Sequence, residues 1–504
     1  MYTHRASTLI GKLPSLASRL CQIPSSRNAR RIAAGAVWSL TGNIALRGLQ
    51  AVSFMFLARR LGRTAFGEFG VIQSTIGVFG ALTGFGLGLT ATRFVAQLRT
   101  TNPERAGRVV GLSILTASAT ATALGILLLA SAYPISVHVL AAGHLAPLLR
   151  LSVAVLVLTA INGAQNGILT GFEAFKSIAI INVITGVVSL ATFISFAYTW
   201  GLLGAVFASL ISAAVPCAIG HIAVHHHARE AKIPIRIRHC LTEARVLYSF
   251  SAPATLAGAM TAPVTWVGNA IIAHQQGGYA ELGVFSAANT IRMALMFVPM
   301  LIQNASFPVV ASAWVRRRDG EYENLLLLTH NSVNTFAIFL AVASLFLGRH
   351  LMRCFGPGFG DIAPLLGLMA SVAIQAIGCV VGASIQVRGA MWGAFALNAL
   401  WGSTFLAFVA CTAPSGAGAL AFGTAAAYLV LLLSQLLWQR RVLPAALLPA
   451  ILGGLVGISA ATALAYFLAD CSLLVKAPVG FVTAALVTKL SLASTKRPTV
   501  VCAS

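Results

Sequence analysis

Long apolar runs separated by short polar stretches make up most of this chain. A membrane-spanning helix needs roughly 20 apolar residues. About fourteen runs reach that length, at 36–58, 66–92, 108–131, 146–170, 177–199, 202–224, 248–273, 282–313, 324–347, 362–387, 391–411, 417–438, 444–469 and 473–492. The runs do not alternate polar and apolar residues as barrel strands do, and lipid forces backbone groups to pair within a segment. The pattern predicts an all-α polytopic membrane protein.

The composition agrees with this interpretation. The 504 residues are 58% hydrophobic and only 9% charged, whereas about a quarter of a soluble domain is charged. So few charges cannot form a water-facing shell around so long a chain. Lipid must therefore be the main solvent of this protein.

The basic residues are distributed unevenly between the connecting segments, and the formal net charge is +23. If the N-terminus is cytoplasmic, 25 of the 34 Lys and Arg residues fall in cytoplasmic segments, as the positive-inside rule expects. This skew predicts that both termini are cytoplasmic and argues against nucleic-acid binding. Arg59, Arg60 and Arg63 are the main exception, because they fall on the outer side. Arg47 and Arg292 fall inside the membrane.

An internal repeat divides the chain into two halves. Residues 36–98 recur as residues 252–314, with Gly67 opposite Gly283 at an offset of 216. Each half holds six helices, an even number, so both halves enter the membrane from the same side. This arrangement predicts parallel repeats around a central cavity, as in transporters whose halves rock about a shared site.

The same patterns predict five parts. They are a basic cytoplasmic arm (1–35), which would contact membrane lipids, an N-terminal six-helix bundle (36–224), a basic cytoplasmic linker (225–247), a C-terminal six-helix bundle (248–440), and an accessory helix pair with a cytoplasmic tail (441–504).

Two stretches of the first half carry a family resemblance. The sequence Phe-Leu-Ala-Arg-Arg-Leu-Gly-Arg-Thr-Ala-Phe-Gly-Glu-Phe covers 56–69, and Gly-Phe-Gly-Leu-Gly-Leu-Thr-Ala-Thr-Arg-Phe-Val-Ala covers 84–96. Together they resemble the O-antigen and exopolysaccharide translocases of the multidrug/oligosaccharidyl-lipid/polysaccharide exporter superfamily. The resemblance implies a bacterial inner-membrane flippase that moves an undecaprenyl-diphosphate-linked saccharide from the cytoplasmic to the outer leaflet. It also implies polysaccharide polymerase or chain-length proteins as partners.

Arg47 is the first candidate binding residue. Asn43, Arg47 and Gln50 stand at i, i+4 and i+7, so they share one helix face. An arginine at the membrane centre costs from ~2.5 to well over 10 kcal/mol, depending on the method, and therefore faces a partner or a wet cavity. In a cavity its guanidinium would bind a diphosphate by paired hydrogen bonds. The alternatives are an internal ion pair with an acidic residue such as Glu68, or burial against backbone carbonyl groups where the helix bundles join.

Arg292 is the second candidate, from the other half. Asn289, Arg292 and Gln303 fall on one face of the 282–313 segment, with Pro299 between them. The alternative is that Arg292 extends along its helix to the outer interface. Two arginines from opposite halves would suit an anionic cargo held between them.

Three further charged residues, Arg93, Arg388 and Glu68, are also candidates for a role in transport. Arg93 and Arg388 lie near helix ends and could meet the cargo at the cytoplasmic mouth, although orientation anchoring and lipid head-group contact are the favoured explanation. Cation-coupled drug exporters need an intramembrane carboxylate. The 11 acidic residues lie almost entirely in loops, and Glu68 is the one candidate for ion coupling.

Several other functions remain as alternatives. A flippase for a peptidoglycan lipid precursor would use the same chemistry. A cation-coupled multidrug exporter is the next hypothesis among transport functions. A membrane-embedded polysaccharide polymerase or a non-transporting scaffold is more remote. We find no Walker A sequence, nucleophile elbow or CxxC pair, so we expect no enzymatic activity, metal site or cofactor.

Overall fold

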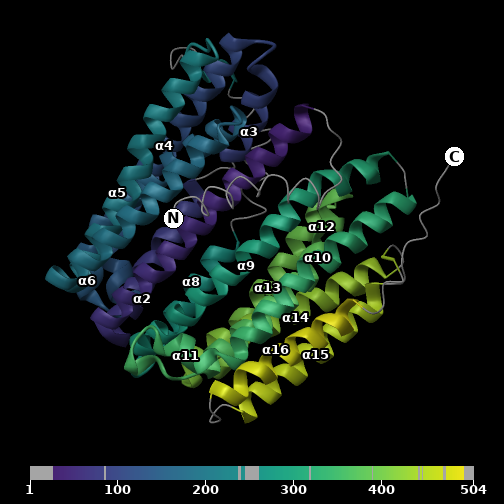
Figure 1. Ribbon diagram of the computed structural model, residues 1–504. Helices are drawn as coiled ribbons and strands as arrows, with labels where there is room; N and C mark the ends of the chain where they lie inside the picture. Colours follow the sequence, from purple (N-terminus) through teal and green to yellow (C-terminus); the bar gives the residue numbers. More distant parts are fainter. Residues whose placement is uncertain are drawn as a thin grey trace, which may run out of the picture.

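The computed structural model describes most of the chain (Figure 1). The described residues are 27–83, 87–235, 240–243, 260–316, 319–388, 390–440, 443–444, 447–468 and 473–492. Most of the expected basic arm, the Gly84–Gly86 part of the family motif, residues 236–239 and 244–247 of the expected linker, residues 248–259 of the expected 248–273 helix, and the tail from residue 493 lie outside them.

The first half consists of long helices joined by short turns. They are α2 (Arg27–Thr83), α3 (Leu87–Leu98), α4 (Pro103–Pro134), α5 (Ala146–Gly171) and α6 (Phe175–Glu230), with the short turns η1 (Ile135–Val139), η2 (Gly143–Leu145) and η3 (Cys240–Glu243).

The second half has the same character. It holds α8 (Thr261–Ala273), α9 (Gly278–Val315), α10 (Asp319–Phe346), α11 (Gly348–Arg353), η5 (Pro357–Phe359), α12 (Ala363–Val387), α13 (Met391–Thr412), η6 (Ala413–Ser415) and α14 (Ala417–Gln439). The pair α15 (Leu447–Phe467) and α16 (Leu473–Leu492) follows and packs against α10 and α12.

The described helices account for thirteen of the predicted crossings and for part of the 248–273 run, and the described residues contain no strand. Within the described residues, ten helices are long and apolar enough to cross a membrane, among them Val37–Thr83 and Phe175–Glu230. Each of these two holds two predicted runs, α16 holds the 473–492 run, and α8 holds the described part of the 248–273 run. The expectation of an all-α membrane protein is therefore confirmed.

Single glycines replace two of the loops that the sequence suggested. The sequence predicts separate helices for the runs 36–58 and 66–92. In the structure both belong largely to α2, which is interrupted only at Gly62, with φ 76° and ψ 177°. In α6 the break is Gly201, with φ 56° and ψ −129°. Gly416, between α13 and α14, has nearly the same backbone angles, φ 58° and ψ −121°. Glycine adopts positive φ without steric cost, so the chain reverses direction within one residue.

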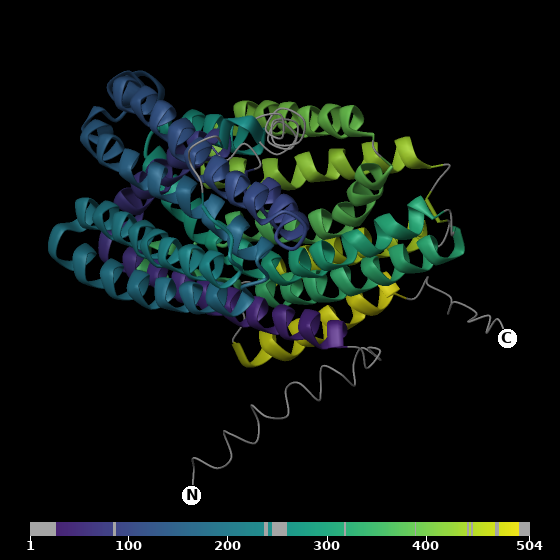
Figure 2. The same cartoon turned by 90° about the horizontal axis from the view of Figure 1, so that it is seen from above.

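The two halves lie side by side in both views, purple to teal on one side and green to yellow on the other (Figure 1, Figure 2). We call the end that holds Gly62, Gly201, α11 and Gly416 the Gly62 end. The opposite end, which holds the turn after α3, is called the Arg99 end. In Figure 1 the halves meet near α11 and lie apart toward α3.

The halves touch at equivalent residues of the repeat. A Cβ atom placed on Gly67 would lie 1.9 Å from the carbonyl oxygen of Tyr279, and one on Gly283 would lie 2.0 Å from that of Arg63. Residues 63 and 279 stand 216 positions apart, as do residues 67 and 283. The crossing of α2 and α9 is thus symmetric, which is the arrangement expected of parallel repeats.

Candidate functional site

The arginine cluster that breaks the predicted charge skew ties the two halves together at the Gly62 end. Arg59 Nε donates a hydrogen bond to the carbonyl oxygen of Cys354 (2.7 Å), and Arg63 Nη2 lies 3.1 Å from Glu281 Oε1. Glu281 Oε2 also accepts from the backbone N–H of Ala417, at the start of α14 (3.1 Å). The first two contacts join α2 to the end of α11 and to α9, and the third links α9 to α14 within the second half. They explain why positive charge is retained on this side.

Arg60 behaves differently from its two neighbours. Its Nη2 donates to the carbonyl oxygen of Tyr198 (3.3 Å), and its guanidinium carbon lies 4.7 Å from the Tyr198 ring centroid. Both contacts stay within the first half. Arg60 therefore stabilises the end of the first segment of α6 and does not bridge the two halves.

α2 and α9 are in contact near the Gly62 end and lie apart farther along their length. We call the line along which these two helices face each other the seam. On α9, Tyr279, Ser286, Met293 and Met300 recur every seven residues and share a face. The first two contact α2, while Met293 and Met300 are 54% and 52% exposed. On α2 a Cβ atom at Gly70 would lie 2.4 Å from Ser286 Oγ, but one at Gly77 would have no neighbour within 4 Å.

The depth at which the seam opens follows from helix geometry. Gly77 lies 15 residues after Gly62, and Met293 lies 15 residues after Gly278, so each is roughly 22 Å along its helix at about 1.5 Å per residue. Between the halves, Trp266 Nε1 donates a hydrogen bond to Thr75 Oγ1 (2.9 Å), just before Gly77 on α2. The halves therefore part about midway through the molecule.

Arg47 lies at this same depth, 15 residues before Gly62 on the first segment of α2. Its side chain is exposed. Phe54 and Ala58 follow it on the same helix face, where the Phe54 ring packs 5.9 Å from Phe69 and 5.6 Å from Phe193, and Ala58 is fully buried. Arg47 therefore lies on the helix face that packs into the core near the Gly62 end, but beyond the packed region, where its side chain is exposed.

The neighbours of Arg47 leave its charge uncompensated. Asn43 and Gln50 are half-buried beside it, and Asn43 donates to the carbonyl oxygen of Ser39 (2.8 Å). Among the described residues Arg47 has no hydrogen bond or ion pair, and Glu68 is instead 2.9 Å from His144 Nε2. The internal Arg47–Glu68 pair considered from the sequence is therefore wrong, and Glu68 lies nearer the Gly62 end.

Arg292 also lies at this depth, 14 residues or roughly 21 Å from the start of α9. Its Nε donates to Asn289 Oδ1 (3.1 Å) and its Nη1 to Gln375 Oε1 of α12 (3.0 Å). Gln303 Nε2 reaches the same helix, at the carbonyl oxygen of Cys379 (3.0 Å). The guanidinium is thus held against α12. It does not extend along α9 toward the outer interface, which is what the alternative interpretation of Arg292 required.

Gln375 is the residue of this network that sequence analysis missed. The helix face of Arg292 was apparent from spacing within one helix, but Gln375 lies 83 positions away. The available signal was its polarity, because it is the one Gln in the middle of the apolar run 362–387.

The two residues predicted at the mouth lie at the Arg99 end, away from Arg47 and Arg292. Arg93 is exposed on α3. Arg388 Nε donates to the carbonyl oxygen of Ser384 (3.0 Å), its guanidinium also binds Gln439, and it lies 5.9 Å from the Trp314 ring. Arg388 is therefore tied into the end of the second half.

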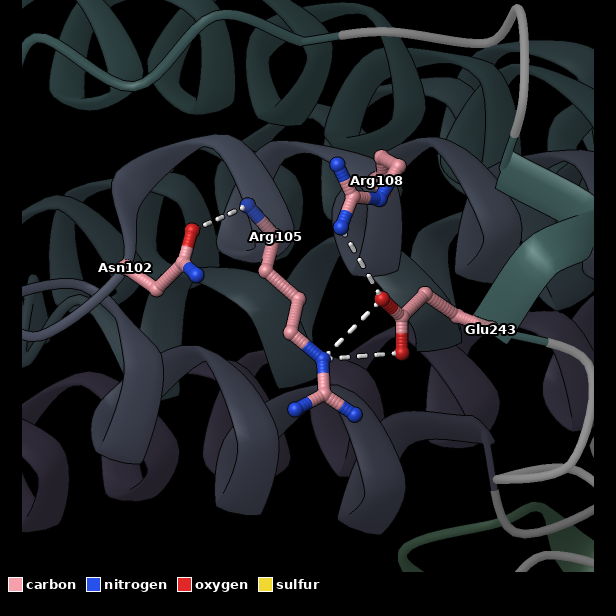
Figure 3. Close-up of polar contacts among 4 residues, drawn as sticks. All are labelled: Asn102, Arg105, Arg108 and Glu243. Atoms are coloured by element: carbon pink, nitrogen blue, oxygen red, sulfur yellow. Dashed lines mark hydrogen bonds and ion pairs between the residues drawn. The ribbon is translucent and has the colours of Figure 1, made fainter.

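A buried carboxylate fixes the connection between the halves to the first half (Figure 3). Arg105 Nε lies 3.0 Å from both oxygens of Glu243, and Arg108 Nη2 lies 3.3 Å from Glu243 Oε1. Asn102 caps the same end of α4 by accepting the backbone N–H of Arg105 (3.0 Å). Residues 240–243 are thereby anchored on α4.

Glu243→Gln should loosen this anchor. The amide keeps the shape but removes the charge that both arginines share, and because the arginines are partly exposed we expect a loss on the order of 1 kcal/mol. Faster proteolysis within 225–247 and a lower melting temperature in detergent would show it. Glu230→Gln, which removes an exposed carboxylate, is the control. Equal stability of the two variants would contradict the assignment.

Comparison with known proteins identifies the family. Residues 32–314, more than half of the chain, match the family model described as polysaccharide biosynthesis protein. The chain is 26% identical over 423 residues to the EPS I polysaccharide export inner membrane protein EpsE of Ralstonia solanacearum, with 80% of this chain and 92% of the relative covered. The protein of the same name from Ralstonia nicotianae is 24% identical over 418 residues, with the same coverage.

Solved structures show the fold. An inward-facing multidrug resistance MATE family transporter of the MOP superfamily aligns with a TM-score of 0.65 at 18% identity, over 85% of this chain and 99% of that one. A MOP superfamily transporter from Pyrococcus furiosus aligns with a TM-score of 0.61 at 17% identity, over 82% and 95%. The chain belongs to the polysaccharide biosynthesis protein family, and it has the fold of the MOP superfamily transporters.

Proposed function

We propose that this protein is a flippase that moves an undecaprenyl-diphosphate-linked oligosaccharide across the inner membrane for surface polysaccharide synthesis. Family membership and the polysaccharide export proteins named above support a multi-pass inner-membrane exporter. The observation that carries the finer proposal is the placement of Arg47 and Arg292. Both stand where the halves part, one from each half, and neither is neutralised by an acidic side chain among the described residues.

The chemistry of these two residues fits a diphosphate. A guanidinium presents five N–H donors in a planar fork that matches phosphate oxygens. Arg292 uses two donors within the protein, which leaves three, and Arg47 has all five available within the described structure. In a site of low dielectric constant, two such cations offset the charge of a diphosphate much more strongly than they would in water.

The proposed mechanism is alternating access. The charge skew orients the Arg99 end toward the cytoplasm, so a structure that is open there receives the cargo from the inner leaflet. The lipid tail stays in the bilayer while the diphosphate binds between the halves. The halves then rock about the α2–α9 crossing, the Arg59 and Arg63 contacts release, and the saccharide is presented on the outer side. The accessory pair α15–α16 remains with the second half.

Replacement of Arg47 tests this proposal. We expect Arg47→Ala to lower polysaccharide export at least about tenfold, since one of two charge-assisted contacts is lost, and to leave lipid-linked repeat units on the cytoplasmic leaflet. Arg47→Lys should retain part of the activity, because the charge remains without the fork. Both the leaflet distribution of the lipid and the exported polymer should be measured in cells that lack the wild-type gene.

The control is Lys489→Ala, which removes an exposed positive charge from the last turn of α16. Normal export by Arg47→Ala at wild-type protein levels would remove Arg47 from the mechanism. An altered susceptibility to cationic dyes without a change in export would favour a drug exporter instead.

A further inference from the structure

We propose that Gln375 is a positioning residue for the cargo: it fixes the guanidinium of Arg292 for diphosphate binding while leaving its charge intact. The inference rests on the proposed function of Arg292. Gln375 belongs to α12, touches Arg292 directly, and gives the site a contribution from a third helix.

The geometry holds the guanidinium from two sides. Gln375 Oε1 accepts from Nη1 at 3.0 Å, and Asn289 Oδ1 accepts from Nε at 3.1 Å. The two acceptors come from different helices, so together they restrain rotation of the guanidinium plane. Both hydrogens on Nη2 and the second hydrogen on Nη1 remain available, and these form the edge that a phosphate group would meet.

The surrounding helix holds Gln375 in place. Val372 and Ala376, on either side in α12, are fully buried, while Gln375 is half-buried. A polar group in an apolar setting is costly unless it is hydrogen-bonded, so the bond to Arg292 fixes the amide as much as it fixes the guanidinium. The Gln303–Cys379 bond keeps α9 and α12 in register next to it.

An amide at this position differs from a carboxylate in one decisive way. Arginine is usually positioned by Asp or Glu, because the charge-assisted pair is stronger. Such a pair would cancel the positive charge that the cargo needs. A neutral amide orients Arg292 and leaves the site with two positive charges, those of Arg47 and Arg292, against a diphosphate.

The test compares Gln375→Glu with the near-isosteric, neutral Gln375→Met, each alone and combined with Arg292→Ala. Binding of farnesyl diphosphate to the purified full-length protein is measured by calorimetry. We expect Gln375→Glu to weaken binding at least tenfold near neutral pH and Gln375→Met to weaken it two- to fivefold. In the Arg292→Ala background Gln375→Met should alter binding less than twofold, whereas Gln375→Glu, whose carboxylate is then unpaired, should still weaken binding by direct repulsion of the diphosphate.

The pH dependence separates positioning from a merely structural role. Protonation of the introduced carboxyl group removes its charge, so the affinity of Gln375→Glu relative to wild type should recover as the pH falls. Gln375→Met should show no such recovery. If Gln375→Glu does not fold, as judged by its melting temperature, the Gln375→Met and Arg292→Ala pair still measures the coupling.

The outcomes separate the two proposals. Weak binding by Arg292→Ala, together with wild-type binding by Gln375→Glu, overturns the role of Gln375 and leaves the proposed function standing. Equal effects of Gln375→Met with and without Arg292 also overturn it. Wild-type binding by Arg292→Ala removes Arg292 from the site, and the positioning role of Gln375 with it.

Discussion

Gly67→Ala should destabilise the protein by about 1–3 kcal/mol and sharply reduce export, as expected for overpacking of a tight contact. The added Cβ atom would lie 1.9 Å from the carbonyl oxygen of Tyr279 and 2.8 Å from the backbone nitrogen of Gly283. Both neighbours are backbone atoms of α9, so no flexible side chain can move aside and the helices must separate. Melting temperature in detergent and polysaccharide export measure the two effects.

The symmetry of the crossing makes this prediction sharper. Gly283→Ala meets the carbonyl oxygen of Arg63 at 2.0 Å and should cost a similar amount. Gly77→Ala is the matched control on the same helix, since its Cβ atom has no neighbour within 4 Å. There the loss of glycine should stabilise the helix slightly, by about 0.4–1 kcal/mol. Identical melting temperatures for Gly67→Ala and Gly77→Ala would show that α2 and α9 do not touch.

A disulfide across the seam should stop transport completely and reversibly. A Cβ atom on Gly70 would lie 3.4 Å from the Cβ atom of Ser286, close to the roughly 3.5–4.5 Å found in disulfides. Gly70→Cys with Ser286→Cys, in a chain whose native cysteines are replaced by Ser, should therefore form a bond that holds the Gly62 end closed. Export should disappear on oxidation and return on reduction.

The control for this experiment is a disulfide that does not cross the seam. A Cβ atom on Gly454 would lie 3.8 Å from that of Ser491, so Gly454→Cys with Ser491→Cys should link α15 to α16. Because both helices move with the second half, this bond should leave export unchanged. If the seam disulfide forms and export continues, the α2–α9 seam does not open during transport.

The fold was predictable where it depends on local patterns. Each apolar run specifies a helix because lipid leaves the backbone no other way to pair its polar groups, and the repeat then fixes the parallel arrangement of the halves. The exact form of the turns was not visible, since Gly62 and Gly201 break their helices through a single positive φ angle. The sequence shows a glycine at these positions but not its conformation.

The candidate site was only half predictable, for a similar reason. Helical spacing places Asn43 with Arg47, and Asn289 with Arg292, because these neighbours lie on one helix. The partners of Arg63 and Arg292 are 218 and 83 positions away and leave no spacing signal. The outer arginines therefore looked like an exception to a rule until their contacts with the second half were known.

The crossing at Gly67 and Gly283 has the isologous form that two identical chains use in a two-fold dimer. A fused duplication of this kind keeps dimer-like geometry while freeing each copy to diverge. Counted along the repeat, Arg47 falls opposite Pro263 and Arg292 falls opposite Ile76. Neither cation has a charged counterpart, so the proposed site is asymmetric even though the crossing that holds the halves together is symmetric.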